Sequence, residues 1–325
     1  MYLTMSQRPL EHILKLFLFL LLVFLILRQV PTEGLWSQLK EMTPTVAFTA
    51  ILLMITRFLL MGMRWRVASD TRLMDVRWFL RNEWHILFLE MAVPIPDAED
   101  ALRMALLRSK GLTWAQGIRS VFYLRLTGLA MMCVILIAFV VIHGARFFEI
   151  AGQWNYGLLA MLILLMTFFA RPTMKFSIPL LEKIPKVGGR LAAVVSSAIE
   201  KPFQPKRIAL LTMLSGLHLL VQACLIQLLL VWVANDVPFL DVFLITPILA
   251  LSFLLPLSIQ GLGLPEAALL LILPRFGVSL EDAGAIAVVH LMAYIAIILM
   301  GGLLFTFDKN LTVSRVLKIW KDGRK

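Results

Sequence analysis

The chain has 325 residues, of which 60% are hydrophobic and only 16% are charged, and its mean hydropathy is +0.87. This composition excludes a soluble globular domain and indicates an integral membrane protein. The formal net charge of +11 would suit a nucleic-acid partner, but the basic residues are concentrated between apolar stretches, a pattern that membrane topology and anionic lipid explain without nucleic acid.

Six apolar stretches are long enough to cross a bilayer as uninterrupted helices. They are residues 12–27, 46–63, 121–142, 156–170, 208–233 and 285–307. Two further stretches, 84–107 and 242–273, are interrupted by proline and charge, and broken backbone is tolerated at membrane depth only where protein or a water-filled cavity surrounds it. We therefore predict an all-α bundle with about six full spans and two re-entrant hairpins of half-helices.

The positions of the basic residues predict the orientation of this bundle. If the N-terminus is cytoplasmic and each hairpin returns to the side it left, the 31 Lys and Arg residues divide into 25 cytoplasmic, four external and two within spans. The external four are Arg28, Lys40, Arg146 and Arg275, and the two within spans are Arg57 and Arg125. This bias predicts cytoplasmic N- and C-termini. Residues 1–308 would form one membrane domain, and the periodicity of 309–325 predicts a basic amphipathic cytoplasmic tail.

A sequence repeat relates the two interrupted stretches. A single shift along the chain aligns Gly111-Leu-Thr-Trp-Ala-Gln-Gly with Gly277-Val-Ser-Leu-Glu-Asp-Ala, and each copy lies between an interrupted stretch and a span. Thr113-x-x-Gln116 is a capping box, and Ser279-x-x-Asp282 is a close variant. Because the charge count places the two hairpins on opposite sides, residues 84–142 and 242–307 are predicted to be inverted repeats, a recurring design of secondary transporters. Chance similarity over so short a stretch is the alternative.

An acid follows a glycine-rich turn in the second interrupted stretch. Gly261 and Gly263 permit tight or left-handed backbone, Pro265 suits the first turn of a helix, and Glu266 would lie at the positive end of that helix. An acid inside a membrane is a functional candidate and needs a partner. We expect that partner to be Arg125 or Arg103 from the other repeat, whereas helix capping alone is the alternative.

Other polar residues in the apolar stretches receive simpler interpretations. Arg57 lies near the basic end of its span, so its side chain is expected to snorkel to the interface. The acidic residues Asp97, Glu99 and Asp100 are expected either to attract cations or to cap the half-helix that carries Arg103.

The remaining ionisable residues show no metal or catalytic pattern. His218 and His290 lie in different spans without the ligand spacing of a metal site, and are expected to form hydrogen bonds between helices. Glu90, four residues before Pro94, is a weaker candidate for the site. The sequence contains no Ser-His-Asp arrangement, phosphate-binding loop or HExxH motif. An enzyme is therefore disfavoured, and no cofactor or metal is predicted.

Two motifs resemble a known family. Pro256-Leu-Ser-Ile-Gln-Gly-Leu-Gly-Leu-Pro-Glu266 is similar to the Pro-x-Ser-x-Gly-Gly-x-Gly-x-Arg-Glu signature of the lysylphosphatidylglycerol synthase transmembrane-region family, also described as flippase-like membrane proteins. Pro94-Ile-Pro-Asp-Ala-Glu-Asp-Ala-Leu-Arg103 and Arg125-Leu-Thr-Gly-Leu resemble two elements of its first half. The chain departs from the pattern at Gln260, at Pro265 and at Ala98-Glu99, which concerns the substrate more than the fold.

The resemblance implies a protein of the bacterial inner membrane that moves lipids or lipid-linked sugars between leaflets. We therefore predict a flippase- or scramblase-like translocator of an anionic phospholipid or a polyprenyl-phosphate-linked lipid. The headgroup would bind at Arg103, Arg108, Arg125, Asp100, Ser258, Gly261, Gly263 and Glu266. A non-transporting membrane partner of a lipid or polysaccharide biosynthetic enzyme is the alternative, and either a homo-oligomer or such an enzyme partner fits the prediction.

Overall fold

A computed structural model describes residues 40, 42–92, 98–143, 196, 204–252 and 264–308. Within these residues the secondary structure consists of eight α-helices and one 3-10 helix, with no strand, so the prediction of an all-α protein is confirmed. The predicted spans 12–27 and 156–170 and the tail 309–325 lie outside the described residues.

Four of the helices are long and apolar enough to cross a membrane. They are α3 (Pro44–Ala68), α6 (Trp114–His143), α10 (Pro205–Trp232) and α13 (Leu280–Phe307). They match the predicted spans 46–63, 121–142, 208–233 and 285–307, but α6 and α13 begin earlier than their apolar stretches. The reason is the capping residues. The Thr113 hydroxyl accepts a hydrogen bond from the backbone N–H of Gln116 at 3.2 Å, and the Ser279 hydroxyl accepts one from the backbone N–H of Asp282 at 3.0 Å.

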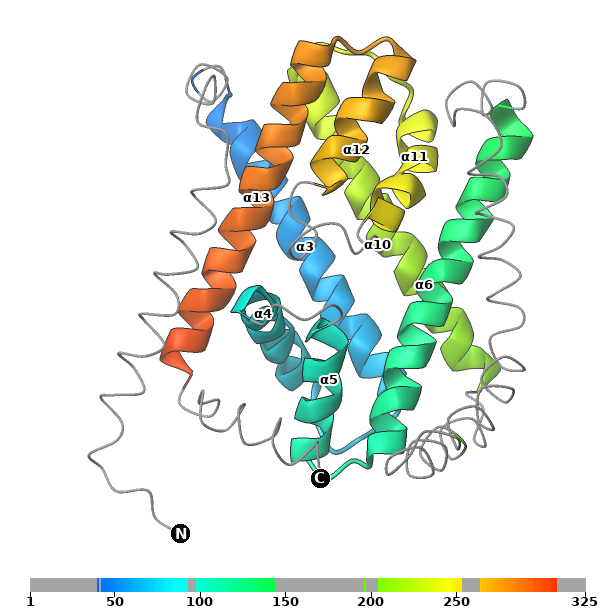
Figure 1. Cartoon of the computed structure of the whole chain (residues 1–325), viewed down its shortest axis with the longest axis vertical. Coiled ribbons are helices and arrows are strands. Elements are labelled where there is room, and N and C mark those ends of the chain that lie inside the picture. The colour runs from blue at the N-terminus through cyan, green and yellow to red at the C-terminus, as the bar shows by residue number, and fades with distance from the viewer. Residues whose placement is uncertain are drawn as a thin grey trace, which may run out of the picture.

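The two interrupted stretches form pairs of shorter helices. The first pair is α4 (Val76–Ala92) and α5 (Ala98–Ser109). The second is α11 (Phe239–Ser252) and α12 (Leu264–Ile272), and the 3-10 helix η2 (Leu273–Phe276) continues from α12. In Figure 1, α11 and α12 lie at the end of the bundle where α13 begins, and α5 lies at the opposite end.

The helices of the two halves follow the same order, and two of them start at the same spacing. Helix α5 begins at Ala98 and α6 at Trp114, and the shift that aligns the sequence repeat carries these two starts onto those of α12 and α13, at Leu264 and Leu280. Figure 1 shows that α6 and α13 run in opposite directions, as do α3 and α10. These long helices of the second half therefore run opposite to those of the first half.

The turn between the short and the long helix is also repeated. Gly111 and Gly277 have left-handed backbone, with φ of 93° and 85°. The amide that follows each glycine donates back to the same point of the preceding helix, from Leu112 to the Leu107 carbonyl at 3.3 Å and from Val278 to the Leu273 carbonyl at 3.4 Å. This is the hydrogen-bond pattern of a helix terminated by a left-handed residue, for which glycine is preferred.

The two halves pack into each other. Helices α3 and α10 form an extensive contact, α4 packs against α13, and α11 packs against α6. One helix of each short pair, α4 or α11, therefore packs against a long helix of the other half.

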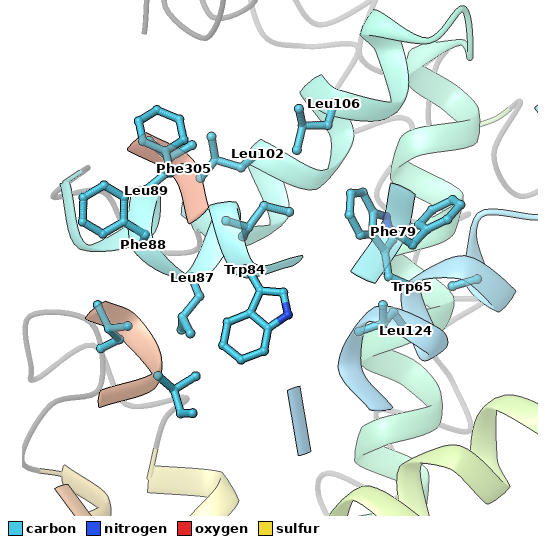
Figure 2. Packing of buried hydrophobic residues seen from close by; sticks show 14 of the residues in the cluster. Trp65, Phe79, Trp84, Leu87, Phe88, Leu89, Leu102, Leu106, Leu124 and Phe305 are labelled. Carbon is cyan, nitrogen blue, oxygen red and sulfur yellow. The ribbon is translucent and has the colours of Figure 1, made fainter. Parts of the chain in front are cut away.

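A cluster of aromatic side chains holds α4 in this position (Figure 2). The rings of Trp65 and Phe79 meet edge to face with centroids 5.0 Å apart, and those of Phe88 and Phe305 are 5.7 Å apart. Gly301 of α13 lies so close to α4 that an added Cβ would be 2.6 Å from the carbonyl oxygen of Trp84. Helix α4 is thus fixed between α3 and α13, and its buried polar residues lie inside the bundle.

The two ends of the bundle differ in charge. Several basic residues lie where α3 and α5 end and α6 and α10 begin, namely Arg66, Arg108, Lys110, Arg119, Lys206 and Arg207. There Asp70 pairs with Arg119 at 2.7 Å and also with Arg207. At the other end the described basic residues are Lys40 and Arg275.

Candidate functional site

A network of charged side chains links α4, α5 and α6, and we call it the first-half cluster. At its centre is Arg103, whose side chain is fully buried and donates hydrogen bonds to Glu83 and Glu99. The Nη1 atom of Arg103 also donates to Asp100 Oδ1 at 3.2 Å. Arg125 donates from Nε to the other oxygen, Asp100 Oδ2, at 2.8 Å, and its Nη2 lies 3.7 Å from Glu99 Oε2. Asp100 thus joins the two arginines.

Helix geometry explains why these side chains meet. Glu99 and Asp100 lie in the first turn of α5, where carboxylates favour the positive end of the helix dipole, and Arg103 follows one turn later on the same face. A third arginine, Arg64 of α3, interacts electrostatically with the cluster and donates from Nη2 to the Leu124 carbonyl at 3.1 Å. Glu90 of α4 also interacts electrostatically with Glu83, Glu99, Arg103 and Arg125. The cluster therefore holds buried charges of both signs side by side, as buried charge requires.

A second polar site lies in the other half, and we call it the second-half triad. It consists of Glu266 on α12, His290 on α13 and Gln222 on α10, all buried. The distance from His290 Nδ1 to Glu266 Oε1 is 2.9 Å, and that from His290 Nε2 to Gln222 Nε2 is 3.1 Å. The Oε1 atom of Gln222 is buried and has no hydrogen-bond partner among the residues that the structure describes.

The two sites occupy equivalent places. Asp100 is the third residue of α5, and Glu266 is the third residue of α12, so the shift that aligns the helices also aligns the two carboxylates. Each carboxylate pairs with a basic residue on the long helix that follows it. The residue is Arg125 on α6 for Asp100 and His290 on α13 for Glu266. The two arrangements are similar but not identical, because the shift that aligns the carboxylates carries Arg125 onto Leu291, the neighbour of His290.

Arg57 lies in the interior near the second-half triad. Its Nε donates to His218 Nε2 at 3.3 Å, and its charge interacts with Glu266 and Tyr294. Tyr294 in turn interacts electrostatically with Glu99 of the first-half cluster and Glu266 of the triad. The expectation that Arg57 snorkels to the interface is therefore wrong, because a histidine of the facing helix α10 accepts its hydrogen bond inside the bundle.

The predicted site residues fall into three groups. Asp100, Arg103 and Arg125 come together in the first-half cluster. Arg108 is exposed near the C-terminal end of α5 and donates to the Leu112 carbonyl at 3.2 Å. Ser258, Gly261 and Gly263 lie outside the described residues.

The expected pairing of Glu266 with Arg103 or Arg125 is not what the structure shows. Glu266 pairs with His290, whereas both arginines bind carboxylates of their own half. The physical reason is proximity: the first turn of α5 supplies Glu99 and Asp100 directly beside the two arginines, and α13 brings His290 to the first turn of α12.

Glu83, Arg64 and Gln222 are not among the residues predicted for the site. Glu83 immediately precedes the interrupted stretch 84–107. The available signal was its spacing from Glu90, because residues seven apart lie on one face of a helix. Within the described residues, no group of three or more His, Cys, Asp or Glu side chains could hold a metal ion.

Comparison with known protein families now bears on these sites. Residues 12–302 match the lysylphosphatidylglycerol synthase TM region. The chain belongs to this family. The match extends over both polar sites, and with the four spanning helices it establishes a lysylphosphatidylglycerol synthase TM-region protein that crosses the membrane several times. A search of the curated proteins finds no match. Family membership is consistent with a lipid-related role of this protein in a membrane.

Proposed function

We propose that this protein moves an anionic lipid headgroup between the leaflets of the bacterial inner membrane, as a flippase- or scramblase-type translocator without an enzymatic step of its own. The supporting observation is that two buried polar sites stand on the first turns of short helices, α5 and α12, within an otherwise apolar bundle. Intramembrane ionisable residues are costly and commonly mark a substrate path.

The proposal includes a membrane topology with six full spans, two re-entrant hairpins in an inverted repeat, and cytoplasmic N- and C-termini. The common shift between the helix starts, the reversed helix directions and the mutual packing of the two halves support it. The basic end near Arg119 and Arg207 would face the cytoplasm. Single cysteines at Arg72 and Leu280 test the orientation: a membrane-impermeant thiol reagent added to intact cells should label the second position and not the first.

Within the first-half cluster, Arg125 is the arginine available to a headgroup. Its side chain is 35% exposed, whereas that of Arg103 is fully buried among carboxylates. A lipid phosphate would replace Asp100 on the guanidinium of Arg125, whose planar fork suits bidentate phosphate binding. Arg103 would remain in place and hold α4 and α5 together, while the acyl chains stay in the surrounding lipid. The turn that includes Gly261 and Gly263 would offer backbone groups from the second half.

Leaflet exchange by purified protein tests this function. Liposomes would contain fluorescent phosphatidylglycerol, and dithionite added outside would bleach only the outer leaflet. We expect the protein to make the inner-leaflet pool accessible, and Arg125→Gln to slow that exchange about tenfold or more, because a charged hydrogen bond contributes about 1.5 to 3 kcal/mol. Arg72→Gln, an exposed loop arginine, is the matched control and should exchange lipid at the wild-type rate.

A folded wild-type protein that leaves the inner-leaflet pool protected, with polyprenyl-phosphate lipids as well as with phosphatidylglycerol, would contradict translocation. That outcome would favour a non-transporting partner of a biosynthetic enzyme, and crosslinking in native membranes would then identify the enzyme. A homo-oligomer is compatible with either function.

A further inference from the structure

His290 of the second-half triad is a titratable group that the proposed translocation leaves unused. We propose that the triad Glu266–His290–Gln222 is a proton-binding site, and that one proton crosses the membrane together with each anionic headgroup. This inference rests on the proposed function, since it assigns an energy source to it.

The hydrogen bonds of the triad accommodate two protonation states. With Glu266 as a carboxylate, His290 Nδ1 carries a hydrogen and donates it across 2.9 Å. The other ring nitrogen, Nε2, faces the amide nitrogen of Gln222 at 3.1 Å. An amide nitrogen only donates, so in this arrangement Nε2 accepts and the imidazole is neutral. We assign this arrangement to the unloaded site.

The side chain of Gln222 can also accept a hydrogen bond when His290 is protonated. Its Oε1 atom is buried and lacks a hydrogen-bond partner in the described part of the chain, and a buried acceptor without a partner is unfavourable. A proton taken up at His290 forms a new Nε2–H bond. A half turn of the amide then brings Oε1 to accept from that bond. Glutamine suits this position because its side chain offers both a donor and an acceptor.

The charged and titratable groups around the triad come from each helix packed against it. Helix α3 contributes Arg57, whose charge acts on Glu266, and α10 contributes His218, which accepts from Arg57. Tyr294 lies one turn beyond His290 on α13, and Glu90 of α4 interacts with that tyrosine.

The remaining neighbouring elements bring few further charges. The described residues of α12 contain no ionisable side chain besides Glu266, those of α11 contain only Asp241 in its first turn, and η2 contains Arg275, which is exposed. His290 contacts Glu266 directly, and its imidazole can bind and release a proton.

The balance of charges inside the bundle explains why a proton would accompany the lipid phosphate. Arg64, Arg103 and Arg125 already face the carboxylates of the first-half cluster, on which Glu90 also acts, and the charge of Arg57 acts on Glu266. A phosphate that enters this interior adds an uncompensated negative charge, which a low-dielectric surrounding makes costly. Arginine remains protonated and cannot respond, whereas His290 can gain a proton and lose it again on the other side. The coupling is therefore a symport of proton and anionic lipid.

A transport measurement under a pH gradient tests the symport. Proteoliposomes with labelled phosphatidylglycerol would carry an imposed pH difference, with the electrical potential held at zero by potassium and valinomycin. One proton per lipid predicts that the lipid accumulates in the leaflet on the alkaline side, about tenfold for each pH unit. Rapid exchange with an equal distribution overturns the proton inference and leaves the proposed function intact, and so does accumulation on the acidic side. Absence of exchange at every pH overturns the proposed function instead.

Variants separate the triad from a general effect of pH. His290→Arg gives the second half a permanent charge like that of the first half, and His290→Gln gives it none, so both should lose accumulation under the gradient. His85→Gln is the matched control, since His85 is also a buried histidine beside a carboxylate, with Nε2 3.5 Å from Asp308 Oδ2. It should retain the gradient response. An unchanged response in His290→Gln would overturn the proposal.

A binding measurement tests for proton uptake at the triad without any transport. Phosphatidylglycerol micelles added to purified protein in weak buffer should cause uptake of about one proton per chain at neutral pH, followed with a pH indicator. His290→Gln should take up none, and His85→Gln as many as the wild type. Thermal unfolding of each variant confirms that it is folded. Lipid binding by the wild type without proton uptake would overturn the inference.

Discussion

Each half of the chain places a carboxylate at the same position of a short helix. The two carboxylates have different partners. Asp100 on α5 pairs with Arg125, inside a cluster that also contains Glu83, Glu99 and Arg103. Glu266 on α12 pairs with His290, which also contacts the amide of Gln222. The first site is a network of charges, and the second is a chain of three side chains.

This difference separates a fixed site from a responsive one. Guanidinium groups stay charged at any physiological pH, so the first-half cluster keeps its ion pairs. The second-half triad has a histidine in place of the arginine, and the proposed proton coupling assigns it two protonation states. Variants in both halves test this contrast.

The largest effect should come from Arg103. Arg103→Leu leaves Glu83, Glu99 and Asp100 with one guanidinium fewer, and removal of one partner from a buried ion pair costs about 3 to 5 kcal/mol. We expect a large loss of the folded form in thermal unfolding of the detergent-solubilised protein. Arg108→Leu on the exposed end of the same helix should change stability by no more than about 0.5 kcal/mol. Equal stability of the two variants would show that the cluster is not a buried network.

A comparison of the two carboxylates comes next. Asp100→Asn removes a charged partner from Arg125 and Arg103 and should cost about 1.5 to 3 kcal/mol, whereas Glu266→Gln leaves a histidine that can stay neutral and should cost about 1 kcal/mol. Chemical or thermal unfolding measures both.

Double-mutant cycles then identify the partner of Glu266. Glu266→Gln and Arg125→Leu should be additive within about 0.5 kcal/mol, and Glu266→Gln and His290→Gln should not be. Coupling to Arg125 in place of His290 would reverse the assignment.

The contact between α4 and α13 predicts an effect of intermediate size. Gly301→Ala places a Cβ 2.6 Å from the Trp84 carbonyl oxygen, which should separate the two helices and cost about 1 to 3 kcal/mol. Gly284→Ala, also in α13, meets its nearest atom at 4.0 Å and should be neutral or stabilising by up to about 1 kcal/mol, because alanine favours helix. Midpoints of thermal unfolding compare the two, and similar values for both variants would refute the close approach.

The smallest effect tests the equivalence of the two turns. Gly111 and Gly277 both have left-handed backbone with open space around the Cβ position. Alanine should therefore cost about 1 kcal/mol at either site, from backbone strain alone. Unfolding experiments that found a cost at only one glycine would show that the turns differ.

Local sequence signals were sufficient for much of the fold. The capping residues Thr113 and Ser279 predict the starts of α6 and α13, and the apolar stretches predict the four long helices, because caps and hydrophobic length act within a few residues of the chain. The shift that relates Gly111 to Gly277 was visible in the sequence, and the same shift relates the starts of α5 and α6 to those of α12 and α13.

Partners across the bundle required the tertiary structure. The sequence by itself determined that Glu266 begins a short helix and that Asp100 and Arg103 share a helical face, because these relations follow from helix geometry. It did not determine that Glu266 meets His290, that Arg57 meets His218, or that Glu83 of α4 is buried beside Arg103. Those pairs depend on how the two halves pack into each other, and a contact between distant residues is decided only when the helices that carry them are brought together.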